Sequence, residues 1–160
     1  MTPRTWSRAC LLAAVAATSG CGGGSSSPTA PSSQSFLAGT WTGTLTIERE
    51  GEAPTSASTT WVFEVVPDTN RQTFRTTIRS EHAWLPVTTT VTTAITPSNT
   101  PPARISTQGD YPSPRGCMGT VLSVGTAEAT RIDADFSGVD CPSLAQSTFR
   151  GRVLLSKTGS

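Results

Sequence analysis

One segment carries the clearest structural signal in the chain: Gly39-Thr40-Trp41-Thr42-Gly43-Thr44-Leu45-Thr46-Ile47-Glu48-Arg49. Its apolar residues and Gly43 fall on one face, whereas its threonines and Glu48 fall on the other. Alternation with a period of two is typical of a β-strand that buries one face. The rest of the chain must therefore supply further strands that cover this apolar face.

Similar segments, rich in β-branched residues, follow along the chain. Seven more strands are predicted, at residues 59–66, 72–79, 84–96, 103–108, 118–126, 131–136 and 148–156. The intervening segments contain glycine and proline, most densely at 97–102 and 109–116, which favours turns and loops. No stretch shows a convincing helical period. We therefore expect an all-β protein, an antiparallel up-and-down barrel of about eight strands.

The first and last predicted strands share a pattern that favours closure of the barrel. Each inward face reads large, glycine, large, large: Trp41-Gly43-Leu45-Ile47 and Phe149-Gly151-Val153-Leu155. Pairing these strands would remove two exposed sheet edges. Glycine inside a strand often marks a sharp bend or a close approach of two backbones. We therefore expect the two strands to pair.

The interior of a small barrel is either filled by side chains or left open for one small apolar ligand. The predicted inward side chains are bulky, and they are Trp41, Leu45, Ile47, Trp61, Phe63, Val65, Ile78, Val91, Ile95, Leu122, Val124, Ile132, Phe136, Phe149, Val153 and Leu155. Both a filled core and a pocket are compatible with this set. For a pocket, the expected lining residues are Trp61, Phe63, Phe136 and Phe149.

Residues 1–20 follow the pattern of a secretory signal peptide. Arg4 and Arg8 supply the positive start, and Ala9–Ala17 is an apolar run too short to span a bilayer. Residues 21–35 are mostly glycine, serine and proline, which predicts a flexible tether. The barrel domain is expected at residues 36–158.

The segment Thr18-Ser19-Gly20-Cys21 resembles the lipobox of bacterial lipoproteins. The resemblance implies that Cys21 is lipidated, becomes the mature N-terminus and anchors the protein to a membrane. Gly22 follows Cys21 where an aspartate would signal retention, which resembles the outer-membrane default in bacteria that have a second membrane. The alternative is ordinary secretion, with cleavage near Gly20 and no lipid.

The cysteines support an oxidising compartment. The chain has four, and once Cys10 and Cys21 are assigned to the signal and the lipid, Cys117 and Cys141 remain. We predict a disulfide between them, which would stabilise the domain by roughly 3–4 kcal/mol. The alternative, two free redox-active thiols, lacks a Cys-x-x-Cys motif. No metal or other cofactor is expected, because one histidine and this pair are too few ligands for zinc.

The segment Gly39-Thr40-Trp41 resembles the Gly-x-Trp signature of lipocalins and related calycin barrels. In that superfamily the tryptophan closes one barrel end, and a basic residue near the end of the last strand packs across it. The resemblance therefore implies a barrel-closing role for Trp41 and for Lys157, although the family prefers arginine at the latter position. It implies a lipocalin-like shape.

Charge excludes some partners. The formal net charge is +1, and removal of Arg4 and Arg8 with the signal leaves 10 basic against 11 acidic residues, or −1. Such a balance does not attract phosphate at long range, so no nucleic-acid partner is expected.

Few residues are candidates for catalysis, metal binding or ligand contact. His82, next to Glu81, is the only histidine and is expected to be a solvated loop residue. Asp133, Asp135 and Asp140 could suggest calcium, but no EF-hand spacing exists, and a solvated outer face is expected. Trp84 is either an exposed contact residue or a plug at a barrel end.

Together these patterns predict a noncatalytic envelope lipoprotein that displays a lipocalin-like barrel and binds a small hydrophobic ligand. The alternative is a surface recognition or inhibitor module that binds an envelope protein through loops 97–102 and 109–116.

Overall fold

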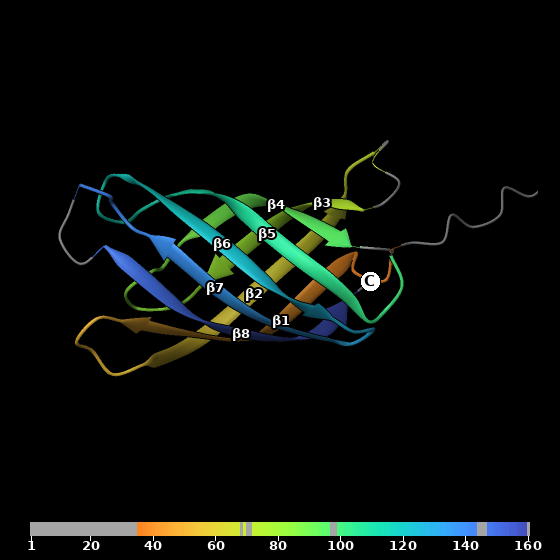
Figure 1. The fold of residues 1–160 in the computed structure, drawn as a ribbon, viewed down its shortest axis with the longest axis horizontal. Coiled ribbons are helices and arrows are strands. Elements are labelled where there is room, and N and C mark those ends of the chain that lie inside the picture. The colour runs from red at the N-terminus through yellow and green to blue at the C-terminus, as the bar shows by residue number, and fades with distance from the viewer. Residues whose placement is uncertain (1–34, 68, 70–71, 97–98, 144–146, 160) are drawn as a thin grey trace, which may run out of the picture. The chain divides into compact units, whose positions relative to one another are not determined.

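The computed structural model describes residues 35–67, 69, 72–96, 99–143 and 147–159. The predicted signal peptide, Cys21 and all of the tether except Ser35 lie outside these residues, as do residues 97–98 of one predicted loop. The described part forms a closed antiparallel barrel of eight strands that neighbour one another in sequence order (Figure 1). This confirms the predicted all-β, up-and-down barrel. Within the described residues, no helix has the length and apolarity needed to cross a bilayer.

The strands are β1 (Gly39–Arg49), β2 (Thr55–Val65), β3 (Thr73–Ser80), β4 (Thr88–Thr96), β5 (Ala103–Pro112), β6 (Met118–Ala127), β7 (Arg131–Val139) and β8 (Thr148–Gly159). Several predicted boundaries were wrong: β2 begins at Thr55 and not at residue 59, β7 ends at Val139 and not at 136, and β8 ends at Gly159 and not at 156. Two further differences have a clear structural reason. Residues 84–87 belong to a loop around an isolated bridge between His82 and Leu85, so β4 begins later than predicted. Residues 109–112 continue β5, where they pair with β6, because Gly109 leaves space for the Val91 side chain and Pro112 stands at the strand end.

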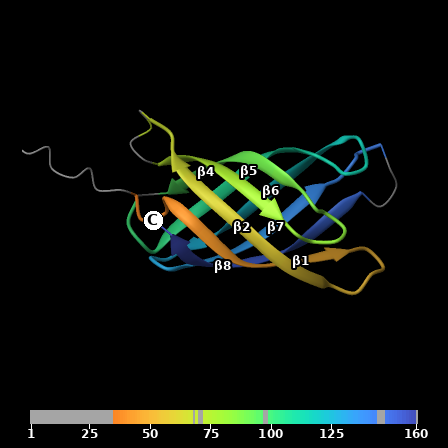
Figure 2. The same ribbon diagram turned by 180° about the vertical axis from the view of Figure 1, so that it is seen from behind.

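The barrel closes through β1 and β8, as predicted. Figure 2 shows β1 between β2 and β8, and the register pairs Gly43 with Leu155 and Ile47 with Gly151. A Cβ atom at Gly43 would overlap the carbonyl group of Leu154, and one at Gly151 would overlap the carbonyl group of Thr46. The two backbones therefore approach so closely that only glycine fits at these positions.

Most predicted inward side chains are buried, and they are Trp41, Leu45, Ile47, Trp61, Phe63, Val91, Ile95, Ile132, Phe136, Phe149, Val153 and Leu155. Val65 and Ile78 are partly buried against this core. Two predictions on β6 were wrong, because Leu122 and Val124 are 46% and 43% exposed whereas Ser123 between them is buried.

The register of β6 explains this correction. Ser123 pairs with Phe136 of β7 and Thr107 of β5, which both face inward. The inward face of β6 therefore consists mainly of small residues, and a Cβ atom at Gly125 would overlap Ala134. Larger side chains do not fit inside along most of this strand, so its leucine and second valine face outward.

The barrel has two different ends. At the Trp41 end, residues 35–38 form a turn that places Leu37 in the core. At the Trp84 end lie the loops 50–54, 81–87 and 113–117 and the described part of 140–147. The chain's C-terminus marks the Trp41 end on the right of Figure 1, and the loops of the Trp84 end lie on the left.

We expect Gly43→Ala to lower the free energy of unfolding by about 3 kcal/mol, because the added methyl group forces β1 and β8 apart. The matched control is Gly159→Ala, whose Cβ atom would lie 3.5 Å from the Thr40 side chain and should change stability by less than about 0.5 kcal/mol. Chemical denaturation measures both. Equal stability of the two variants would contradict the close contact between the strands.

Candidate functional site

The Trp41 end is sealed by its own side chains. The indole Nε1 of Trp41 donates a hydrogen bond to the carbonyl oxygen of Leu37 at 2.8 Å. Lys157 lies opposite Trp41 in the register, and its Nζ is 5.6 Å from the centre of the Trp41 ring. The same Nζ donates to the carbonyl oxygen of Phe36 at 2.7 Å, and partial burial lowers the pKa of this ammonium group. The structure therefore brings Trp41 and Lys157 together at a closed end.

Aromatic side chains fill the half of the barrel next to Trp41. Phe63 packs edge-on against Trp41, with ring centres 6.4 Å apart, and edge-on against Phe74 at 6.2 Å. These rings leave Phe63 inside the packed core and away from the lining of the internal cavity. Of the four expected lining residues, Phe63 is the one that the structure does not place there.

The other half of the barrel holds an apolar cavity of about 50 Å³. Its lining includes the other three expected residues, and it is formed by Leu45, Trp61, Ile78, Ser80, Leu85, Val87, Thr89, Thr107, Tyr111, Val121, Ser123, Phe136 and Phe149. A water molecule needs only about 10–15 Å³ of such space, whereas pockets for drug-sized ligands occupy about 300–1,000 Å³. The barrel is therefore mostly filled but retains one small internal space.

Trp84 caps this half of the barrel. It is partly buried against the core, and its ring centre lies 5.3 Å from that of Phe149, a residue of the cavity wall. The guanidinium groups of Arg49 and Arg115 lie 4.8 and 4.7 Å from the centre of the Trp84 ring. Of the two alternatives for Trp84, the structure supports the plug, held by two cation–π contacts.

Both arginines are fixed by carboxylates from neighbouring loops. Arg49 forms an ion pair with Glu52, and Arg115 Nη1 lies 2.9 Å from Asp140 Oδ2. Asp140 is 0% exposed, so the prediction that it lies on a solvated face was wrong. The Asp140 carboxylate can be buried because Arg115 of loop 113–117 and Tyr111 of β5 pair with it. Sequence spacing gave no signal for this contact.

Tyr111 is the second partner of Asp140. Its hydroxyl group donates a hydrogen bond to Asp140 Oδ1 at 3.0 Å. Burial, followed by the hydrogen bond and the negative charge of Asp140, raises the pKa of the Tyr111 hydroxyl well above its ordinary value. The phenol therefore stays protonated and keeps donating to the carboxylate throughout the neutral range.

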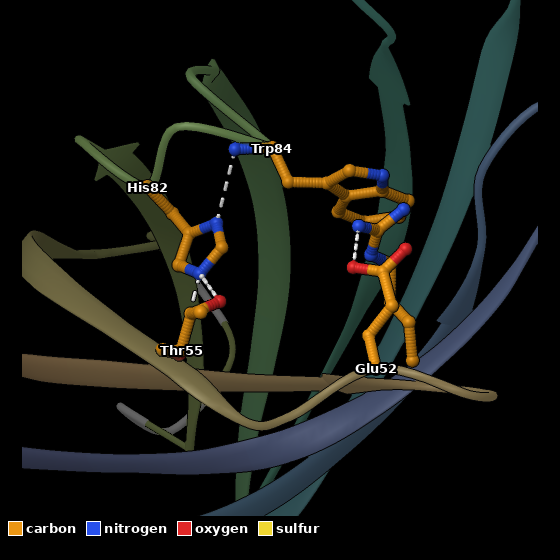
Figure 3. A network of polar contacts seen from close by, with 5 residues as sticks. Glu52, Thr55, His82 and Trp84 are labelled. Atoms are coloured by element: carbon orange, nitrogen blue, oxygen red, sulfur yellow. Dashed lines mark hydrogen bonds and ion pairs between the residues drawn. The ribbon is translucent and has the colours of Figure 1, made fainter.

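His82 holds the loop that carries Trp84. Its Nδ1 accepts a hydrogen bond from the backbone N–H of Trp84 at 3.2 Å, and its Nε2 lies 2.8 Å from Oγ1 and 3.2 Å from the carbonyl oxygen of Thr55 (Figure 3). The backbone N–H of Trp84 can only donate, so Nδ1 is the acceptor in this contact. The imidazole is only 3% exposed, so the prediction of a solvated histidine was wrong. Its partner Thr55 is 27 residues away, which is why the sequence did not reveal the burial.

A disulfide links two loops at the Trp84 end. Cys117 and Cys141 are bonded, with their Cα atoms 5.4 Å apart, which confirms the predicted pairing. The bridge fixes loop 113–117, which carries Arg115, beside Asp140. Asp140 and the two sulfur atoms lie within 4.8 Å of one another, but both sulfurs are used in the disulfide and are not free metal ligands.

The other carboxylates lie on the outer surface. Asp133 accepts hydrogen bonds from Arg152 at 2.7 and 2.6 Å, and Arg152, with Arg131 nearby, lowers the pKa of Asp133. Asp135 is exposed one pleat further along β7. The solvated outer face predicted for these two residues agrees with the structure.

A scan against protein-family models gave no match, and searches of curated proteins and of solved structures gave no significant match. The class that the fold defines is a small closed eight-stranded β-barrel. Function has to be inferred from the side chains of this barrel.

We expect the stability of the protein to fall as pH rises above about 10. The pKa of Tyr111 is higher in the folded than in the unfolded chain, where it is about 10, so the folded state retains a proton that the unfolded state loses. The slope contributed by Tyr111 should approach about 1.4 kcal/mol per pH unit. Denaturant unfolding at several alkaline pH values should show this slope in the native protein and a shallower one in Tyr111→Phe.

Tyrosinate absorbance supplies the control, because Tyr111 is the only tyrosine of the chain. An absorbance midpoint near pH 10 in the folded protein would show that the hydroxyl is not held by Asp140.

Proposed function

We propose that the chain is a noncatalytic envelope lipoprotein whose lipocalin-like barrel holds one small, largely apolar ligand. The observation that carries this proposal is the apolar cavity beside Phe149, at the end of the barrel capped by Trp84. The opposite end is sealed by Trp41, Lys157 and the turn at residues 35–38. Access therefore runs past Trp84.

The cavity limits the size of the ligand. A volume of about 50 Å³ with Trp84 in place is too small for a long acyl chain. It suits a compact molecule of a few carbon atoms, and displacement of the Trp84 ring would add room for a six-membered carbon ring. The ligand class is thus narrower than that of a barrel with a wide central pocket.

The side chains near the cavity support a binding role and not catalysis. Both ring nitrogens of His82 are engaged by Trp84 and Thr55, so this imidazole positions the capping loop. Asp140, a deeply buried carboxylate of the Trp84 end, is paired with Arg115 and hydrogen-bonded to Tyr111. Neither group is left free to transfer a proton to a bound molecule.

Export and anchoring by Cys21 are supported by the sequence and by the disulfide. A bridge between Cys117 and Cys141 suits an oxidising compartment outside the cytoplasm. The tether at residues 21–35 would let the barrel stand off the membrane. We place the protein on the bacterial envelope, at the outer membrane where one is present.

The anchor is tested by Cys21→Ser in cells supplied with a labelled fatty acid. The native protein should carry the label and sediment with membranes, whereas the variant should carry none and appear in a soluble extracytoplasmic fraction. Cys10→Ser, which changes the other cysteine of the N-terminal segment, is the matched control and should still be labelled. Labelling of Cys21→Ser would refute lipidation at this residue.

Ligand binding is tested with the soluble Cys21→Ser protein and methylenecyclohexane, a compact hydrocarbon. We expect saturable binding with a Kd in the high-micromolar to millimolar range, about what seven carbon atoms can supply. Thermal shift and calorimetry measure it. Trp84→Ala should admit larger hydrocarbons that the Trp84 form excludes, whereas Leu154→Ala on the outer face should leave the size limit unchanged.

Failure of every compact hydrocarbon to bind would remove the internal ligand and favour the recognition module. Besides the loops predicted from the sequence for that module, the outer face of β6 then becomes a candidate contact surface, because Met118, Leu122 and Val124 are its exposed large apolar side chains. Beside Leu122 lies a shallow depression that Gln108 and Ser137 help to line.

A further inference from the structure

Two buried polar groups of the cavity wall have no hydrogen-bond partner among the residues that the structure describes. They are the indole Nε1 of Trp61, on β2, and the hydroxyl Oγ of Ser123, on β6. Trp61 is 3% exposed and Ser123 is 2% exposed, so neither group can be satisfied by bulk water. A buried donor left unpaired destabilises the folded state, which makes it an unusual feature of a folded protein.

The other polar side chains of the wall are already engaged. Thr107 Oγ1 shares a hydrogen bond with Thr93 Oγ1 at 2.8 Å, and Thr89 Oγ1 donates to the carbonyl oxygen of Asp110 at 3.1 Å. The two remaining groups also have partners: Ser80 Oγ accepts from the backbone N–H of His82, and Tyr111 donates to Asp140. Among the polar side chains of the wall, Trp61 Nε1 and Ser123 Oγ are thus the two groups that make no hydrogen bond with the described residues.

The wall also defines which polar group a ligand can carry. None of the lining residues has an ionisable carboxylate, ammonium or guanidinium group, so a charged ligand would be left without a counter-ion. An indole N–H is a donor only, which requires an acceptor atom. A hydroxyl can donate to the same atom or accept from a neighbouring group.

We propose that the ligand is a neutral compact molecule with an apolar body and one acceptor oxygen, a ketone, aldehyde, ether or ester, which accepts a hydrogen bond from Trp61 Nε1. Ser123 Oγ supplies a second polar contact on the opposite wall. This inference rests on the proposed binding function and adds the chemical class of the ligand. Trp61 is then the residue that orients the ligand, and the apolar side chains hold its body.

The test compares cyclohexanone with methylenecyclohexane, which have the same ring and differ in an oxygen for a CH₂ group. The protein is the full chain with Cys21→Ser, and the variant is Trp61→Phe, which removes the N–H and keeps an aromatic ring. We expect Trp61→Phe to weaken cyclohexanone binding about tenfold and to change hydrocarbon binding by less than about twofold. Calorimetry measures both affinities.

Indole N–H resonances give a second readout that does not depend on the variant. The Trp61 signal should move downfield when cyclohexanone binds and stay in place with the hydrocarbon. Trp41 is the internal control, because its Nε1 is already bonded to Leu37 and should not respond to either probe.

The possible results separate the proposed ligand class from the binding function itself. Binding of both probes with equal losses in Trp61→Phe and no shift of the Trp61 signal would overturn the inference and leave the binding function standing. Binding of neither probe would overturn both. A Trp61 signal that reports contact with a bound water, unchanged by cyclohexanone, would show a hydration site only and would also overturn the inference.

Discussion

The closed barrel depends on one backbone contact, the approach of β1 to β8 at Gly43 and Gly151. Any side chain at these positions would overlap a carbonyl group of the other strand. The contact joins the first strand of the barrel to the last, which leaves no sheet edge unpaired. It also places Lys157 opposite Trp41, so the seal at one end follows from the same register. A sequence without these two glycines would have to keep the ends of the sheet further apart.

The distribution of residue sizes around the barrel explains why one half is filled and the other is not. Large rings from β1, β2 and β3 meet in the Trp41 half. On β6 the inward residues are small, and the spaces at Gly119 and Gly125 are taken by Tyr111 and Ala134. Ser123 lies between these two positions and lines the cavity. The cavity therefore arises next to Ser123, because its side chain is small and the neighbouring side chains do not fill the space beside it.

The predictions from sequence succeeded where a pattern was local and failed where burial depended on distant partners. The alternation in residues 39–49 and 148–156 fixed the faces of both strands, and elimination of other cysteines fixed the disulfide. On β6, apolar residues at 121, 122 and 124 fall on both faces of the strand. Periodicity alone therefore favoured the face of residues 122 and 124 as the inward one, which was wrong.

The predictions that His82 and Asp140 are solvated were wrong for a different reason. Each is a polar residue whose burial is permitted by partners far away in the sequence, Thr55 for the imidazole and Tyr111 for the carboxylate. A loop residue with no apolar pattern around it carries no local signal of such a partner. Trp84 was ambiguous for the same reason, since its cap position depends on Arg49 at the end of β1 and on Arg115 of loop 113–117.

The way Trp84 is held bears on whether a closed cavity can exchange ligand. The end of β1 contacts the ring through Arg49, and loop 113–117 contacts it through Arg115. The disulfide and the Tyr111–Asp140 pair anchor Arg115 independently of the ring. Moving the indole therefore disrupts two cation–π contacts and the packing on Phe149 but leaves these anchors intact. Two such contacts amount to roughly 1–4 kcal/mol, and the aromatic pair with Phe149 adds roughly 0.5–1.5 kcal/mol. An open state at roughly 1.5–5.5 kcal/mol is populated at about 0.01–7%, so a small molecule could pass Trp84 while the strands remain paired.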